Sequence, residues 1–429
     1  MAKKGTFNSS FFGNFATRLH GTPVRFGILL GQRVEASLGD VVLAAATPQV
    51  PKEDGEAPPI KDVATLLKSQ QGDSSFANWA AQHIDSLSKL VPGGIVPLGC
   101  FVVASEATAK DLAPQLVPPM RNLIDPLVLS IDPSSRKTSW LQLSMGPKPA
   151  LRQAQMKPEA YKEHLLLWTT TEVDVMLPFD GSLPHDGDTA ELVEQTSRYV
   201  DQDLRERCCC VLSSSQVVDF GSEANVSAIA AKGAEDLRIG FLRSGTVRSG
   251  GSEIGSSGCR VRATIAASIL ILRRNVEFRH AVEQLRKEVA KTAAERLQVA
   301  LDDCPGELCG KRLDLPWRSF HMPQDLELPL WFGDYCMKDE EHAEARERLG
   351  FFLGAQPDML EQAPDHLDEQ KILTAKHPGT YGPEPADVKP KDVSNPTEDM
   401  QDPGPPKGPI AACVGIAVLI VAVAIPLLR

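Results

Sequence analysis

The residues of this chain best suited to chemistry are its cysteines, nine among 429 residues. A thiolate is the nucleophile of cysteine hydrolases, and nearby arginines lower the pKa of a thiol. Residues 208–210 are three cysteines that follow two arginines in RERCCCVLSSS, and Cys100 lies in the apolar run LGCFVVAS. Each setting is also typical of a buried strand, where cysteine is a small core side chain. An unconventional cysteine site, at Cys100 or at the triplet, therefore stays open as an alternative to a protein without catalysis.

Other catalytic and metal-binding patterns are incomplete. The nine histidines are isolated, and none forms HxH, HExxH or a Cys-flanked pair. Cys304 and Cys309 (CPGELC) have no second pair to complete a tetrahedral zinc shell. The Gly/Ser-rich residues 248–260 contain neither GxSxG nor GK[ST], and His83 lies on the apolar face of a predicted helix. The sequence therefore predicts no catalytic residue, no metal ligand and no cofactor.

The elements that would position these residues follow an α/β pattern. Residues 24–31 and 40–46 are apolar runs typical of two strands joined by a hairpin. Residues 76–91 place apolar side chains three and four apart, which predicts an amphipathic helix. The next stretch, SKLVPGGIVPLGCFVVAS (88–105), predicts a tight Pro-Gly-Gly turn that leads into a buried strand. Cys100 and Ser105 are the reactive side chains on that strand.

The second half is predicted to be β-rich between residues 208 and 274, followed by a long helix over 275–303 and another over 339–353. From residue 376 to 409, prolines and mixed charges replace large apolar side chains, so this stretch cannot offset its ordering entropy. We expect five parts: an N-terminal segment (1–23), an α/β domain (24–205), a β-rich portion that continues the folded region (206–355), an acidic, Pro-rich disordered linker (356–409) and a membrane span (410–428).

The membrane span is the clearest physical signal in the chain. Residues 410–428, IAACVGIAVLIVAVAIPLL, contain no charge. At about 1.5 Å per residue a helix of this length covers about 28 Å, close to the roughly 30 Å of a bilayer core. Without an N-terminal signal peptide, the sequence predicts a tail anchor with the bulk of the chain in the cytosol. Anchor residues along this helix include Ile410, Val414, Val418, Val421, Ile425 and Leu428.

The charge and cysteine content of the chain restrict its possible partners and its compartment. The formal net charge is −11 and no dense basic stripe is present, which weighs against binding to nucleic acid. An odd number of cysteines that includes a triplet does not resemble a disulfide framework, so a reducing compartment is favoured. The partner predicted from composition and hydropathy alone is therefore the lipid bilayer.

Several stretches, taken together, resemble one family. They are FGILLGQ (26–32), DVVLAAATP (40–48), WAAQHIDSLSKLVPGGIVPLGCFVV (79–103), GCRVRATI with the long helix that follows it, LDLPWRSFHMP (313–323), GDYCMKDEEHAEARERL (333–349) and the terminal span. Their order and spacing resemble the ODR-four family, named for odorant-response abnormality and often called GPCR-chaperone proteins. The resemblance covers blocks across most of residues 24–353, and the central block is the most specific.

The resemblance implies a single-pass, tail-anchored protein of the endoplasmic-reticulum membrane, and the missing catalytic residues favour a non-enzymatic one. Members of the family are associated with the folding and export of multi-span receptors. They are also implicated as membrane adaptors for the cysteine peptidase that removes the ubiquitin-fold modifier. Two alternatives remain: a membrane-tethered hydrolase with an unconventional cysteine site, and an anchor in the outer membrane of mitochondria or plastids.

The first half is also similar to the start of an MPN (JAB1/MPN) domain, in which two strands and a helix precede a Gly-led apolar strand. Active metalloproteases of that group carry His-x-His on this last strand. Here the corresponding residues 98–105 are LGCFVVAS, without a histidine. Lacking a metal to lower the pKa of a bound water, such a strand has no hydrolytic nucleophile. The expected fold is therefore α/β (α+β): a catalytically inactive, MPN-like mixed sheet with packed helices.

Overall fold

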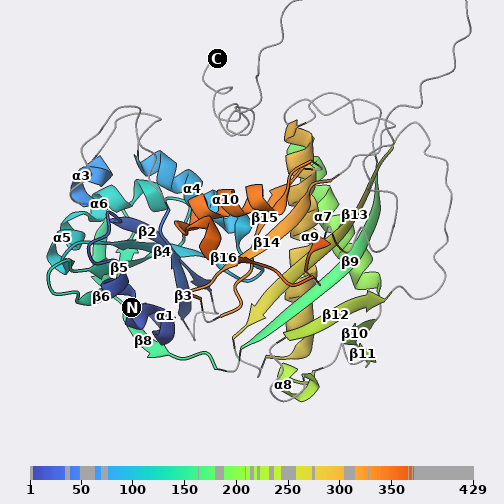
Figure 1. Ribbon diagram of the computed structural model, residues 1–429, viewed down its shortest axis with the longest axis horizontal. Helices are drawn as coiled ribbons and strands as arrows, with labels where there is room; N and C mark the ends of the chain where they lie inside the picture. The colour runs from blue at the N-terminus through green and yellow to red at the C-terminus, as the bar shows by residue number, and fades with distance from the viewer. Residues whose placement is uncertain are drawn as a thin grey trace, which may run out of the picture.

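The computed structural model describes residues 3–33, 39–48, 63–68, 76–162, 164–178, 188–207, 209–212, 217–219, 223–230, 236–242, 258–272, 276–303, 315–326, 328–337, 339–365, 367–369 and 371. Within them the chain forms three β-sheets with helices packed against them (Figure 1). The predicted anchor, 410–428, lies outside these residues. None of the described helices is both long and apolar enough to cross a bilayer.

The first sheet has eight strands in the order β7-β6-β5-β4-β2-β3-β1-β8. β4 runs parallel to β5, and β1 runs parallel to both β3 and β8, whereas the other neighbours are antiparallel. The predicted mixed sheet is therefore confirmed. Its strands are β1 (Lys4–Asn8), β2 (Phe26–Gln32), β3 (Asp40–Ala46), β4 (Val96–Val102), β5 (Leu127–Ile131), β6 (Thr138–Ser144), β7 (Ala150–Gln153) and β8 (Gln155–Glu159).

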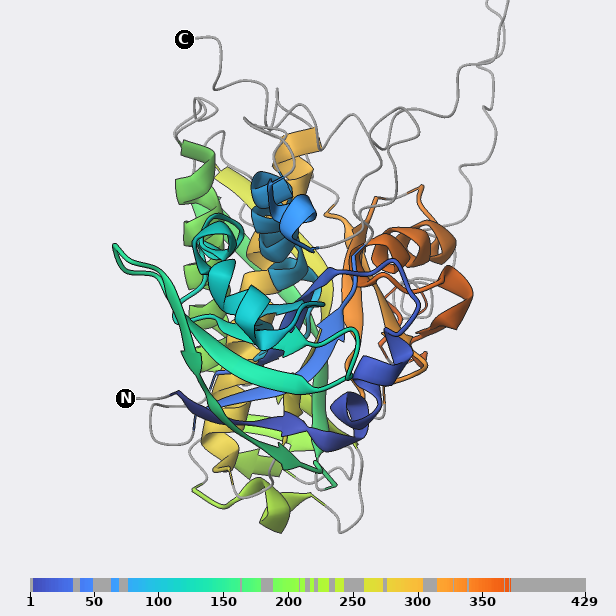
Figure 2. The ribbon, with the colours of Figure 1, turned by 90° about the vertical axis from the view of Figure 1, so that its left-hand side faces the viewer.

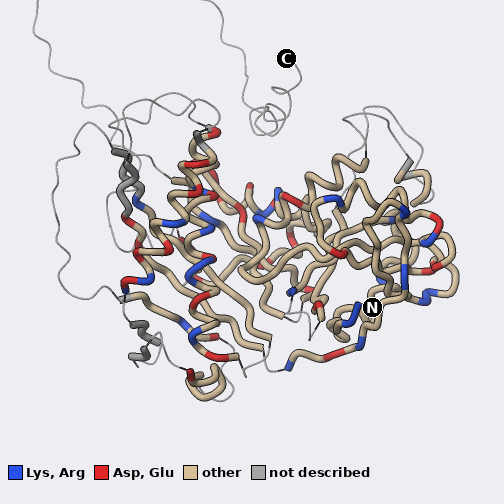
Figure 3. Tube along the Cα trace, turned by 180° about the vertical axis from the view of Figure 1, so that it is seen from behind, with Lys and Arg blue, Asp and Glu red and all other residues tan. Residues whose placement is uncertain are grey.

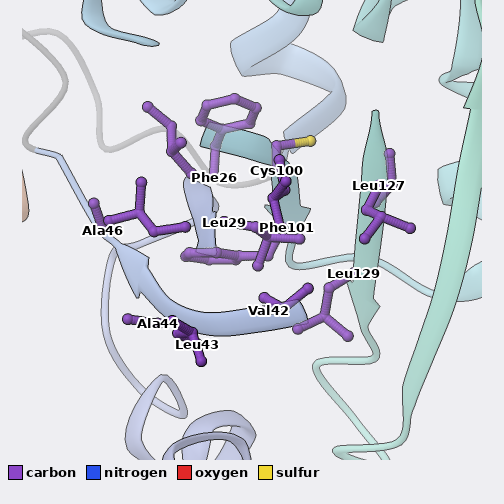
Figure 4. Packing of buried hydrophobic residues seen from close by; sticks show 14 of the residues in the cluster. Phe26, Leu29, Val42, Leu43, Ala44, Ala46, Cys100, Phe101, Leu127 and Leu129 are labelled. Atoms are coloured by element: carbon purple, nitrogen blue, oxygen red, sulfur yellow. The ribbon is translucent and has the colours of Figure 1, made fainter. Parts of the chain in front are cut away.

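Short helices and the amphipathic helix α4 accompany this sheet, as the view turned by 90° also shows (Figure 2). α4 (Phe76–Leu90) buries Ala80, Ile84 and Leu87, the stripe that its sequence predicts. Side chains from β2, β3, β4 and β5 meet in the core (Figure 4). The other helices are α1 (Ser9–Gly13), α2 (Phe15–Arg18), α3 (Val63–Lys68), α5 (Glu106–Asp111), α6 (Ala113–Leu116) and η1 (Pro118–Met120).

The second sheet has five strands in the order β11-β10-β12-β9-β13. Its two long strands, β9 (Leu165–Pro178) and β13 (Gly258–Ile271), pair antiparallel along their whole length. One face packs against α7 (Asp188–Glu206) and α9 (Phe278–Asp303) through residues such as Leu167, Ile265 and Leu285. The remaining elements are β10 (Cys209–Leu212), β11 (Val217–Asp219), β12 (Asp236–Leu242) and α8 (Val226–Ile229).

The third sheet lies between the other two (Figure 1). It consists of β15 (Phe332–Cys336), β14 (Trp317–Pro323) and β16 (Leu360–Gln362), with α10 (His342–Leu353) and η2 (Pro357–Met359). Phe332 belongs to the core of the first sheet, whereas Phe320 packs against the second. Acidic and basic residues are interspersed along the described trace (Figure 3).

Three boundaries between the expected parts of the chain differ from the structure. The change of sheet falls between Glu159 of β8 and Leu165 of β9, not at residue 205. Residues 3–18 of the N-terminal segment belong to the folded body, because β1 inserts between β3 and β8. The first residues of the expected linker belong to the fold, because η2 and β16 continue it and Leu367 is fully buried. The proline-rich composition that suggested disorder starts only at residue 376.

Candidate functional site

Strand β4, the candidate reactive strand, lies inside the first sheet between β2 and β5. Cys100, Phe101 and Val102 are fully buried, so both faces of the strand are covered (Figure 4). Gly99 lies so close to β5 that an added Cβ would meet the carbonyl oxygen of Leu127 at 1.8 Å. Strand β4 therefore forms packed core, without a side chain open to a cleft. Within the described residues, no group of three or more His, Cys, Asp or Glu side chains could hold a metal ion.

The Cys100 thiol has the wrong environment for a nucleophile. Burial raises the pKa of Cys100 well above its ordinary value. Reactive cysteines need the opposite shift and contact with solvent. Cys336 is likewise buried, and burial together with Asp334 raises the pKa of its thiol. Of the triplet, Cys208 lies outside the described residues, and the next two cysteines begin β10.

The other reactive group of this stretch, Ser105, is the N-cap of α5. Its Oγ accepts a hydrogen bond from the backbone N–H of Thr108 at 3.2 Å and lies 2.9 Å from the Thr108 hydroxyl. An N-cap of this kind satisfies one of the amides that a helix leaves without a partner at its first turn. The position of Ser105 is thus explained by helix capping.

The Pro-Gly-Gly turn before β4 joins the first sheet to the second. The N–H of Gly93 donates to the carbonyl of Ser268 in β13 at 3.0 Å, and Gly93 forms a parallel bridge with Ile269. A Cβ at Gly93 would lie 2.6 Å from Ile269 Cγ2 and 2.9 Å from Glu288 Cγ. Gly94 has φ +81°, a conformation that glycine adopts without strain. The two glycines are therefore required for close approach and for the turn.

His83 of α4 packs against α10. Its Nε2 lies 3.0 Å from the carbonyl oxygen of Phe352, and its ring lies against Trp79 and Phe352. Burial lowers the pKa of His83 to about 4, although the hydrogen bond to the Phe352 carbonyl opposes this shift. The imidazole is therefore neutral near pH 7. The predicted position of His83 on the apolar face of a helix is confirmed.

Sequence analysis missed a cluster of a serine, two histidines and an aspartate. Ser319 Oγ lies 2.9 Å from His321 Nε2 and 2.7 Å from His342 Nδ1. His342 Nε2 lies 3.3 Å from Asp368 Oδ2. Burial would raise the pKa of Asp368, but the hydrogen bond from His342 and the backbone N–H and charge of Lys371 hold it below its usual value. The cluster connects β14, α10 and the segment after β16.

Proton positions in this cluster follow from its acceptors. The ionised Asp368 only accepts, so Nε2 of His342 carries a proton. When His342 is neutral, its Nδ1 accepts from the Ser319 hydroxyl, whose oxygen is then free to accept from His321. Burial, followed by the positive charges of His342 and Arg346, lowers the pKa of His321 to about 4. His321 is therefore neutral near pH 7.

The cluster contains the residue types of a hydrolase triad but not its geometry. In such triads Nε2 of the histidine faces the serine, and Nδ1 faces the carboxylate. In this cluster the two nitrogens are exchanged, and Ser319 is fully buried, without access for a substrate. The arrangement holds α10 and the C-terminal segment against β14. The Ser-x-His pair at 319–321 is the sequence signal that could have revealed it, because residues two apart share one face of a strand.

Comparison with known proteins identifies the family. A family model described as Odorant response abnormal 4-like matches residues 27–360. The chain belongs to this family. It is similar to the protein odr-4 homolog of Mus musculus, with 22% identity over 379 residues that cover 78% of this chain and 79% of that protein. The homolog of Gallus gallus is 21% identical over 399 residues, covering 81% of this chain and 82% of that protein. The resemblance inferred from the sequence blocks is thereby confirmed.

Among solved structures, the chain is similar to the crystal structure of UfSP from C. elegans. The sequence identity is 11% and the TM-score is 0.42. The similarity covers 82% of this chain and 56% of that chain.

Proposed function

We propose that this protein is a non-enzymatic adaptor or chaperone of the endoplasmic-reticulum membrane, with its folded body in the cytosol. It assists the folding or trafficking of multi-span, GPCR-type receptors, recruits a ubiquitin-fold-modifier cysteine peptidase to the membrane, or does both. The observation that carries this proposal is membership of the Odorant response abnormal 4-like family over residues 27–360. The uncharged residues 410–428 support the membrane attachment.

The packing of β4 supports a body that binds rather than cleaves. We infer an MPN-like scaffold without its zinc site, because the buried residues Val102 and Ala104 stand where the active enzymes present histidines. The raised pKa and full burial of Cys100 speak against the cysteine-hydrolase alternative. Alkylation of the purified protein tests that alternative directly. A hydrolytic activity abolished both by a thiol reagent and by Cys100→Ala would overturn the adaptor proposal.

Localisation is tested with a fluorescent protein fused to residues 376–429. The proposal expects the fusion to co-localise with an endoplasmic-reticulum marker. The same fusion carrying Asp at Val418 and Val421 is the matched control, because a charge near the centre of a span opposes insertion. Delivery of the unmodified fusion to mitochondria or plastids would refute the placement.

Partners are tested by affinity purification from solubilised membranes followed by mass spectrometry. Recovery of a ubiquitin-fold-modifier peptidase supports the adaptor role, and recovery of multi-span receptors supports the chaperone role. Absence of both classes from the purified complexes would contradict the proposal.

A further inference from the structure

The last described residues form a strap across the third sheet, made of residues 360–365, 367–369 and 371. Its strand β16 pairs with β14 at only three positions. Leu360 is buried in the first core, whereas Ala363 and Leu367 pack with Trp168 and Phe320. The strap therefore has few backbone pairs and a small apolar contact, and the remaining contacts come from its polar side chains, Asp368 beside His342 among them.

Two buried carboxylates make the main polar contacts of the strap: Asp368 contacts α10, and Glu369 contacts β13, β14 and α9. Glu369 is fully buried. Its Oε1 accepts from the backbone N–H of Ala266 in β13 at 2.6 Å, and its Oε2 accepts from the N–H of Arg318 in β14 at 2.8 Å. Glu369 also forms an ion pair with Arg296 of α9, which is itself almost fully buried. One side chain thus joins two sheets and a helix.

The contacts of Glu369 are explained by the unpaired edges of two of the described strands, β13 and β14. β13 is the last strand of the second sheet, and β14 pairs with β16 only at positions 321–323. Ala266 and Arg318 therefore donate from strand edges that have no strand partner among the described residues. A buried N–H without an acceptor is unfavourable, and so is a buried guanidinium without an anion. The Glu369 carboxylate satisfies all three donors where a further strand would satisfy only the amides.

We propose that the strap is a detachable element, secured by Glu369, that docks and undocks as a unit while the rest of the body stays folded. Elements with few backbone pairs open at lower free energy than the core of a domain. Undocking exposes the edges of β13 and β14 together with Arg296, and so uncovers a site suited to a carboxylate. The inference depends on the fold alone and does not rest on the proposed function.

Hydrogen exchange of the full chain in detergent, resolved to single amides, tests this proposal. In the wild type, the amides of Ala266, Arg318 and Ala363 should exchange with a common opening that is faster than that of α9. Glu369→Gln leaves an acceptor oxygen but no charge to balance Arg296, and should accelerate exchange at these amides at least tenfold. Glu361→Gln is the matched control, because Glu361 lies exposed on the same strap. Its exchange rates should stay within twofold of the wild type.

A second variant covers the case in which the Glu369 variant does not fold. Leu367→Ala loosens the strap without changing its charge, and should accelerate exchange at the same distant amides of Ala266 and Arg318. Equal acceleration of α9 and β9 would show that the strap is an inseparable part of the core, and would overturn the proposal. Unchanged rates at Ala266 and Arg318 in both variants would also overturn it.

Discussion

Replacing Gly93 with alanine tests whether the Pro-Gly-Gly turn is the junction between the first and second sheets. The added methyl group would lie 2.6 Å from Ile269 Cγ2 and 2.9 Å from Glu288 Cγ, so β13 or α9 must move. Overpacking of this kind costs about 1–3 kcal/mol. Displacement also weakens the hydrogen bond from Gly93 to Ser268, which contributes about 0.5–1.5 kcal/mol. We therefore expect a loss of about 2–4 kcal/mol in the free energy of unfolding.

Urea unfolding of the full chain in mild detergent, followed by tryptophan fluorescence, measures this loss. Gly13→Ala is the matched control, because Gly13 is helical and a Cβ there meets nothing within 4 Å. That control should be neutral or stabilising by up to about 1 kcal/mol. Equal stability of the two variants would refute the assignment of the turn as a packed junction between the sheets.

Three further predictions concern the anchor, two histidines and one thiol. Replacing both Val418 and Val421 with Asp should raise the free energy of membrane insertion by about 2.5–3.5 kcal/mol for each residue. The chain should then be released from membranes, and a double variant that still needs detergent for extraction would contradict the membrane span. His83 and His321 have a pKa of about 4 when folded and about 6.5 when unfolded. The unfolded chain thus binds more protons between these values, so stability is full above about pH 6.5 and falls toward pH 4. Each histidine should lower the free energy of unfolding by about 2 kcal/mol between pH 7 and pH 5. A free energy of unfolding that does not change with pH in urea titrations would contradict this. Finally, Cys100 should resist maleimide until the chain unfolds, as peptide mapping can show; rapid modification of the native protein would disprove its burial.

Periodicity was sufficient to predict the elements with strong local patterns. The apolar runs of β2 and β3, the stripe of α4 and the long helix α9 all lie close to their expected bounds. α7 was missed although Leu192, Thr196, Val200 and Leu204 recur every fourth residue and are buried. That spacing is a usable signal of an amphipathic helix.

The remaining features depend on contacts between distant residues. The strand β1 is short and weakly apolar, and it becomes a strand because β3 and β8 pair with it on either side. Glu369 lies in an acidic run that is typical of solvated chain. It is buried because Arg296, 73 residues earlier, and the edge amides of two sheets need a carboxylate. No local pattern contains that information.

In the candidate site, too, the features with a local sequence pattern could be predicted, and those that depend on distant residues could not. The buried strand without histidines predicted within 88–105 is confirmed as β4, but the strand ends at Val102, and Ser105 caps α5 beyond it. Packing explains Cys100 and capping explains Ser105. The cluster around Ser319 escaped notice because His342 and Asp368 are distant in sequence, and each histidine appears isolated when spacing is the only criterion.

The central claim is that this family member acts by binding partners at a membrane. Quantitative affinity purification of the wild type against the double variant with Asp at Val418 and Val421 tests it most directly. The account predicts that a ubiquitin-fold-modifier peptidase or multi-span receptors are recovered with the wild type from the membrane fraction. It also predicts that the double variant loses their membrane association. Recovery of neither class, or equal membrane association of the partners with both forms, would contradict it.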